Sequence, residues 1–165
     1  MDYLEILRND AKLAEEFDML FDFHLLDGLK ERDTAEGRCT FSLPGKAFGR
    51  DEIASYTECG RIAESVDDLI RLLVYSICWH DYCDTSQYTD ISILEAYANE
   101  RHDEIASYTE MDVWETVVQV LGMPLEANVA AELQKFYDAA HRAPLYICYF
   151  HEDDGTVTES HNLFF

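Results

Sequence analysis

The chain has few basic residues, few glycines and prolines, and no long apolar run. Only 12 of its 165 residues are lysine or arginine, against 34 aspartates and glutamates, so the formal net charge is −22. A field of that sign repels phosphate backbones and anionic lipid surfaces. The composition therefore disfavours binding to nucleic acid or to a membrane surface.

The shortage of glycine and proline argues for an ordered chain. Seven glycines and three prolines are dispersed along it, while 48% of the residues are hydrophobic and 13% are aromatic. Such a composition is typical of a folded globular protein. Because a chain of 165 residues can bury one core without disulfides or metals, we predict a single domain over residues 1–165.

The marks of an exported or membrane protein are also missing. The N-terminal segment lacks the basic start and apolar run of a secretory signal, and no apolar run reaches membrane-spanning length. The five cysteines are odd in number and scattered, unlike a secreted disulfide framework, at Cys39, Cys59, Cys78, Cys83 and Cys148. We therefore expect a cytoplasmic protein, and its oligomeric state stays open.

Apolar residues at helical spacing predict five helical segments. The first runs from about Asp2 to Leu29, with a break near Asp22 as the alternative. The others run from Val66 to about Cys78, Ile91 to about Ser107, Asp112 to Leu121, and Leu125 to His141. The segment that begins after Ser65 has the densest apolar residues, so we place it at the centre of the core.

Three further segments alternate with the period of a strand. They are Arg38 to Leu43, which precedes a Pro44-Gly45 turn, then Leu145 to Phe150, and Thr156 to Phe165. The dipeptide Asp154-Gly155 between the last two favours a tight hairpin turn. We therefore predict an α+β fold: a single helix-rich domain with a small mixed or antiparallel sheet that includes a C-terminal hairpin.

The octapeptide DEIASYTE occurs twice, at Asp51–Glu58 and at Asp103–Glu110. The flanking residues do not match, which argues against a repeat architecture and leaves a local duplication or a sequence error as explanations. We expect the two copies to differ in structure. The first precedes Cys59-Gly60, where a helix is disfavoured, whereas the second can finish the helix that begins at Ile91.

The centre of the chain resembles the SUKH superfamily, which groups fungal cell-wall-assembly regulators with bacterial immunity proteins. The likeness rests on four stretches: Ala47–Asp51, Glu58–Ala63, Ser65–Tyr75 and Trp79–Asp81. The Gly-Gly-aromatic hairpin that the family shows after the aspartate is missing, and the first octapeptide stands in its place. The resemblance implies a SUKH-like domain that acts by contact with a protein partner and is not an enzyme.

The leading hypothesis is a SUKH-like immunity protein that neutralises a toxin domain by occlusion. The net negative charge suits a basic protein partner, although solubility explains the charge equally well. A regulatory scaffold of the same family and an uncharacterised small enzyme are the alternatives. The enzyme requires a concave pocket with convergent polar groups of perturbed pKa.

The candidate partner-binding residues follow the central helix and combine aromatic and acidic side chains: Trp79, Asp81, Tyr82, Asp84 and Tyr88. Aromatic anchors provide desolvated contact, while carboxylates steer a basic partner. The alternative interpretation is that Trp79 fills the core where the central helix ends.

Metal binding and catalysis find weak support. Cys78, His80 and Cys83 are ligand types that zinc selects, but their C-x-H-x-x-C spacing is not a recognised zinc signature. We interpret them as a helix end whose cysteines pack as small hydrophobes. No serine or cysteine stands in a recognised nucleophile motif, and no glycine-rich phosphate loop precedes a helix. We predict no metal, no cofactor and no catalytic residue.

Overall fold

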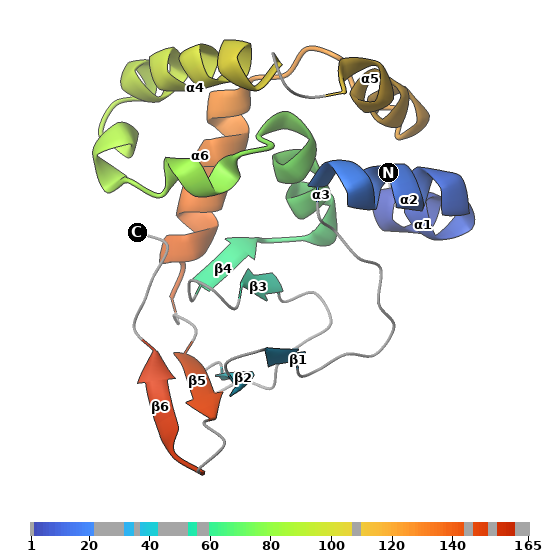
Figure 1. Ribbon diagram of the computed structural model, residues 1–165. Helices are drawn as coiled ribbons and strands as arrows, with labels where there is room; N and C mark the ends of the chain where they lie inside the picture. The colour runs from blue at the N-terminus through green and yellow to red at the C-terminus, as the bar shows by residue number, and fades with distance from the viewer. Residues whose placement is uncertain are drawn as a thin grey trace. The chain divides into compact units, whose positions relative to one another are not determined.

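The computed structural model describes residues 2–21, 32–34, 37–42, 53–55, 60–106, 110–143, 147–151 and 155–160. Side chains are described within 2–21, 61–101, 110–143 and 155–157. The α-helices are α1 (Tyr3–Asn9), α2 (Ala11–Phe21), α3 (Val66–Tyr75), α4 (Ile91–Ala106), α5 (Met111–Val120) and α6 (Val129–His141) (Figure 1). Two 3-10 helices lie between α3 and α4: η1 (Trp79–Tyr82) and η2 (Thr85–Tyr88).

The strands are short and fall into two antiparallel groups. Their bounds are β1 (Arg32–Thr34), β2 (Gly37–Ser42), β3 (Ile53–Ser55), β4 (Gly60–Ala63), β5 (Ile147–His151) and β6 (Val157–Ser160). The backbone order is β1-β2-β5-β6 in one group, and β3 pairs with β4 in the other. In the larger group Phe150 of β5 lies between two partners, Cys39 of β2 on one side and Thr158 of β6 on the other.

The predicted α+β fold class is wrong. Where side chains are described, 71% of the residues are helical and 4% are strand, and this part contains six helices, one strand and no sheet. The prediction placed a small sheet with a C-terminal hairpin in one core with the helices. The strands instead fall in a compact unit separate from α1–α5, so the core of the helical unit forms between helices.

Two compact units divide the chain. The first comprises Met1–Leu25 and Val66–Lys135, and the second comprises Leu26–Ser65 and Phe136–Phe165. The predicted turn at Pro44-Gly45 and the SUKH-like stretch Ala47–Asp51 lie outside the described residues. Helices α1–α5 and the first half of α6 belong to the first unit.

The N-terminal region forms two helices in place of the one predicted. Asp10 divides the segment, because its backbone is extended (φ −127°, ψ 96°), and α2 then ends at Phe21, next to the Asp22 that the alternative prediction named. Its carboxylate accepts a hydrogen bond from the Leu13 N–H at 3.0 Å. An aspartate in this position satisfies a free N–H at the start of α2, which favours a new helix over continuation of α1.

Helix α3 supplies the centre of the first unit, as its apolar density predicted. Its buried side chains are Leu69, Ile70, Leu72, Leu73, Val74 and Tyr75. Full burial of one large apolar side chain contributes roughly 1.5–3 kcal/mol, so this one helix accounts for a large part of the stability. It ends at Tyr75, before the predicted Cys78, because the Trp79 N–H bonds the Ser76 carbonyl at 2.9 Å and starts the tighter η1.

Hydrogen bonds join neighbouring elements to α3. The Tyr3 N–H of α1 donates to the Asp67 carboxylate at 3.1 Å, and the Trp114 indole N–H of α5 donates to the Val74 carbonyl at 2.9 Å. The Trp114 bond is buried, where an unsatisfied donor would cost about 1–3 kcal/mol. These contacts explain why α1 and α5 approach α3 at defined points.

The connection between α5 and α6 begins with a glycine cap. Gly122 has φ +67°, its N–H bonds the Gln119 carbonyl at 3.0 Å, and the Met123 N–H bonds the Val118 carbonyl at 2.9 Å. This pair of bonds is the Schellman pattern, and it confirms that Gly122 ends the helix. Helix α6 starts at Val129, later than predicted, because the Asn128 side chain caps it by accepting from the Ala131 N–H at 3.1 Å.

The two DEIASYTE copies adopt different backbones, as predicted. Ile53–Ser55 of the first copy form β3, whereas Ile105 and Ala106 of the second copy lie in the last turn of α4. Identical residues therefore occur here as strand and as helix.

We predict that Gly122→Ala lowers the free energy of unfolding by about 1 kcal/mol, because an alanine Cβ is strained at positive φ. Denaturant unfolding followed by circular dichroism measures the loss. Gly122→Asn should lose less, since asparagine tolerates the left-handed region. Equal losses in the two variants would contradict the capping argument.

Candidate functional site

The predicted partner-binding residues lie in η1, η2 and the short link between them, but two of the three aromatics, Trp79 and Tyr82, are not on the surface. Trp79 is 7% exposed and Tyr82 is 1% exposed. The Tyr82 ring meets the Tyr97 ring of α4 edge to face, with centroids 5.1 Å apart. Trp79 and Tyr82 therefore belong to the core of the first unit, which is the alternative that the sequence left open for Trp79.

Exposed carboxylates remain in this region. Asp81 pairs with Arg101 of α4, and Asp84 accepts a hydrogen bond from the Ser86 N–H at 2.9 Å as the cap of η2. Asp90 accepts from the N–H and hydroxyl of Ser92, at 2.8 and 2.6 Å, at the start of α4. Hereafter Asp81, Asp84 and Asp90 are called the acidic segment.

Local hydrogen bonds keep two members of the acidic segment ionised. Bonds from the Ser86 backbone and side chain lower the pKa of Asp84, and bonds from the Ser92 side chain and backbone lower the pKa of Asp90. Both carboxylates are consequently charged at neutral pH and are oriented by their caps. Tyr88, the fifth predicted residue, is half-buried at the end of η2.

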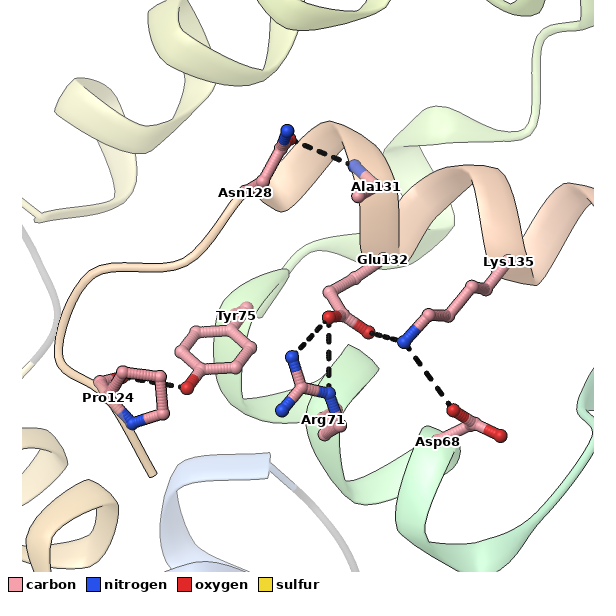
Figure 2. A network of polar contacts seen from close by, with 8 residues as sticks. All are labelled: Asp68, Arg71, Tyr75, Pro124, Asn128, Ala131, Glu132 and Lys135. Carbon is pink, nitrogen blue, oxygen red and sulfur yellow. Dashed lines mark hydrogen bonds and ion pairs between the residues drawn. The ribbon is translucent and has the colours of Figure 1, made fainter. Parts of the chain in front are cut away.

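A network of charged groups joins α3 to α6 (Figure 2). Glu132 is only 5% exposed, and one of its oxygens accepts from Arg71 Nε at 3.1 Å and Arg71 Nη2 at 2.5 Å. Its other oxygen accepts from Lys135 Nζ at 3.1 Å, and Lys135 also lies 3.6 Å from Asp68. The bond to Glu132 raises the pKa of Arg71, so the guanidinium stays charged.

This network is structural in character. Both oxygens of Glu132 are engaged by cations of the protein itself, so neither is available to a ligand. The sequence analysis missed it. The i,i+3 spacings of Asp68 with Arg71 and of Glu132 with Lys135 were visible, but the pairing of Arg71 with Glu132 joins residues 61 positions apart.

The possible metal ligands do not converge. Cys78 and Cys83 form no disulfide with a described residue and are of intermediate burial, and the His80 ring stacks on Trp79 with centroids 3.5 Å apart. Within the described part of the chain, no three His, Cys, Asp or Glu side chains are grouped so that they could hold a metal ion.

A cavity of about 210 Å³ lies within the first unit. Its lining is mostly apolar and includes the rings of Tyr75, Tyr82 and Trp114, with Ser76 and Glu126 among its few polar residues. Burial raises the pKa of Tyr75, and it raises the pKa of Tyr82 to about 12, so both phenols are neutral at pH 7. Among the described residues that line the cavity there is no histidine, cysteine, lysine or arginine, and these lining residues suit the binding of a mostly apolar ligand.

The loop in front of α6 closes one side of this lining. The Tyr75 hydroxyl donates to the Pro124 carbonyl at 2.7 Å, and the chain then leads to the Asn128 cap of α6 (Figure 2). Leu125, Glu126 and Ala127 of the loop line the cavity. The sequence analysis predicted helix here and so could not place these residues at a site.

Comparisons with known proteins add no relative: no family model, no curated protein and no solved structure matches the chain. The SUKH resemblance therefore stays a prediction. Among the described residues, no helix combines the length and the apolar character needed to cross a membrane.

We predict that Glu132→Ala lowers the free energy of unfolding by about 2–3 kcal/mol, because it leaves the partly buried Arg71 without its partner. Arg71→Met should be similarly costly, since Glu132 then stays buried with Lys135 alone. The double variant Arg71→Met/Glu132→Ala should cost less than the sum of the two single variants, as measured by a double-mutant cycle in urea. Additive losses would show that the two side chains do not interact.

The capping carboxylates predict a defined acid titration. The pKa values of Asp84 and Asp90 in the folded protein lie below 3.8, the usual value. The two ionised carboxylates therefore stabilise the fold fully above pH 3.8, and this stabilisation is lost as the pH falls through the folded pKa values. Carboxyl-carbon NMR should give midpoints below 3.8 for both residues. Ser92→Ala should move the Asp90 midpoint upward and leave that of Asp84 in place; parallel movement of both would contradict local capping.

Proposed function

We propose that this protein is an acidic binding protein that recognises a basic protein partner, as a SUKH-like immunity protein does when it occludes a toxin domain. The observation that supports the proposal best is the net charge of −22 together with the exposed, oriented carboxylates of the acidic segment. Recognition, and not chemical conversion, is the proposed role.

Charge of this size acts before contact. A strongly negative surface raises the association rate with a basic partner through long-range steering, and salt weakens the effect by screening. Oriented carboxylates add to this, because Asp84 and Asp90 are already ordered by their caps and lose little conformational freedom on binding.

The burial of Trp79 and Tyr82 shapes the proposed interface. Since neither ring is accessible, the contact around η1 and η2 is polar and relies on charge for specificity and register. Half-buried Tyr88 is the aromatic residue of the predicted set that can still add apolar contact. Such an interface gives a fast association rate whose value depends strongly on salt.

The test uses basic toxin domains encoded beside the gene for this protein as probes. Stopped-flow association at low and high salt should show a rate that falls at least tenfold as screening increases. Asp84→Asn/Asp90→Asn removes two charges but keeps two good caps, because asparagine also accepts from free N–H groups. This variant should associate several-fold more slowly at low salt, with unchanged thermal stability.

Glu5→Gln/Glu15→Gln is the matched control, since it removes two exposed charges from α1 and α2 of the same unit. An equal slowing in both variants would assign steering to total charge and remove the acidic segment from the interface. Salt-independent association, or no binding to any neighbouring toxin domain, would overturn the proposed function.

A further inference from the structure

The cavity of the first unit has the size of a site for one aromatic ring. An apolar cavity of about 150 Å³ accepts benzene, and this cavity measures about 210 Å³. The rings of Tyr75, Tyr82 and Trp114 line it together with aliphatic side chains. Aromatic walls favour a ring as occupant, because offset and edge-to-face contacts add to simple burial.

Ser76 places a buried polar group in the lining. Ser76 is 3% exposed, and its hydroxyl makes no hydrogen bond to any residue that the structure describes. Both backbone groups of Ser76 already form hydrogen bonds, since its N–H donates to the Leu72 carbonyl and its carbonyl accepts from the Trp79 N–H. A buried hydroxyl without a partner costs free energy, and a ligand that bonds it would recover that cost.

Two other buried donors in the lining are already occupied. The Tyr75 hydroxyl donates to the Pro124 carbonyl at 2.7 Å, and the Trp114 indole donates to the Val74 carbonyl at 2.9 Å. At Ser76 a ligand can gain a hydrogen bond without breaking either of these two bonds.

The charge of the lining residues determines which sign of charge a ligand should carry. Among the described residues of the lining, Glu126 is the one acidic residue, it is exposed, and no basic residue accompanies it. Tyr75 and Tyr82 add no charge, because a phenol is neutral at pH 7 and burial raises the pKa of each further. With a chain charge of −22, the potential at the cavity mouth attracts cations and repels anions.

We propose that this cavity binds a small aromatic amine that carries a hydrogen-bonding group on its ring. The ring lies among Tyr75, Tyr82 and Trp114, its substituent bonds the Ser76 hydroxyl, and the ammonium lies beside Glu126. The site is independent of the proposed partner, because none of these residues belongs to the acidic segment.

Four small probes test the chemistry on the unaltered protein by NMR chemical-shift titration at low salt. Tyramine should bind, with shifts at Ser76, Trp114 and Glu126. Phenethylamine lacks the phenol hydroxyl and should bind about fivefold more weakly. Butylamine lacks the ring, and 4-hydroxyphenylacetate replaces the ammonium with a carboxylate, so each should bind at least tenfold more weakly.

Variants assign the contacts. Ser76→Ala should reduce tyramine affinity about fivefold and leave phenethylamine affinity unchanged, which a general loss of structure would not do. Glu126→Gln should weaken both amines about threefold, whereas Glu115→Gln, an exposed residue of α5 outside the lining, should change neither. Thermal melting confirms that each variant is folded.

Three results would overturn the proposal. One is the absence of tyramine binding at millimolar concentration. Another is binding of 4-hydroxyphenylacetate as tight as that of tyramine. The third is an equal effect of Ser76→Ala on tyramine and phenethylamine. The first two use the unaltered protein, so they remain decisive if a variant fails to fold.

Discussion

Burial of α3 is the interaction on which the rest of the first unit depends. Six of its ten residues are buried, and its backbone and side chains receive hydrogen bonds from Tyr3 and Trp114 on two other helices. Because close-packed cores tolerate few voids, the helices around α3 are positioned by the shape of its apolar surface. The cavity beside Val74 and Tyr75 lies against this core, and Leu125, Glu126 and Ala127 of the loop before α6 complete its lining.

Polar contacts determine how the packed helices are aligned with one another. Glu132 is held between Arg71 and Lys135, and such a buried arrangement specifies one register of α6 on α3 more than it adds stability. Capping residues do the same locally: Asp10, Asp90 and Asn128 each satisfy N–H groups at a helix start. Carboxylates that could serve recognition therefore also define where helices begin, and the two roles are compatible because the caps leave them exposed and charged.

The separation between charged surface and aromatic core decides which functions are plausible. A surface of exposed carboxylates suits a basic macromolecule, and a small apolar cavity suits a ring-bearing ligand. The sequence predicted that aromatic and acidic residues near Trp79 would act together, since they alternate along the chain. The 3-10 turns of η1 separate them, turning Trp79 and Tyr82 inward and leaving Asp81 exposed.

The sequence by itself determined the helices, the central position of α3, the end of α5 at Gly122 and the negative charge. Each follows from a local property: the spacing of apolar residues, the ability of glycine to adopt positive φ, or the ionisation of side chains. It did not determine that the strands would lie outside the helical unit, that Arg71 would meet Glu132, or that Ser76 would line a cavity, since each needs contacts between distant segments. The DEIASYTE copies show the reason most directly. The same residues form β3 opposite β4 and the end of α4, so their backbone is decided by the segments around them.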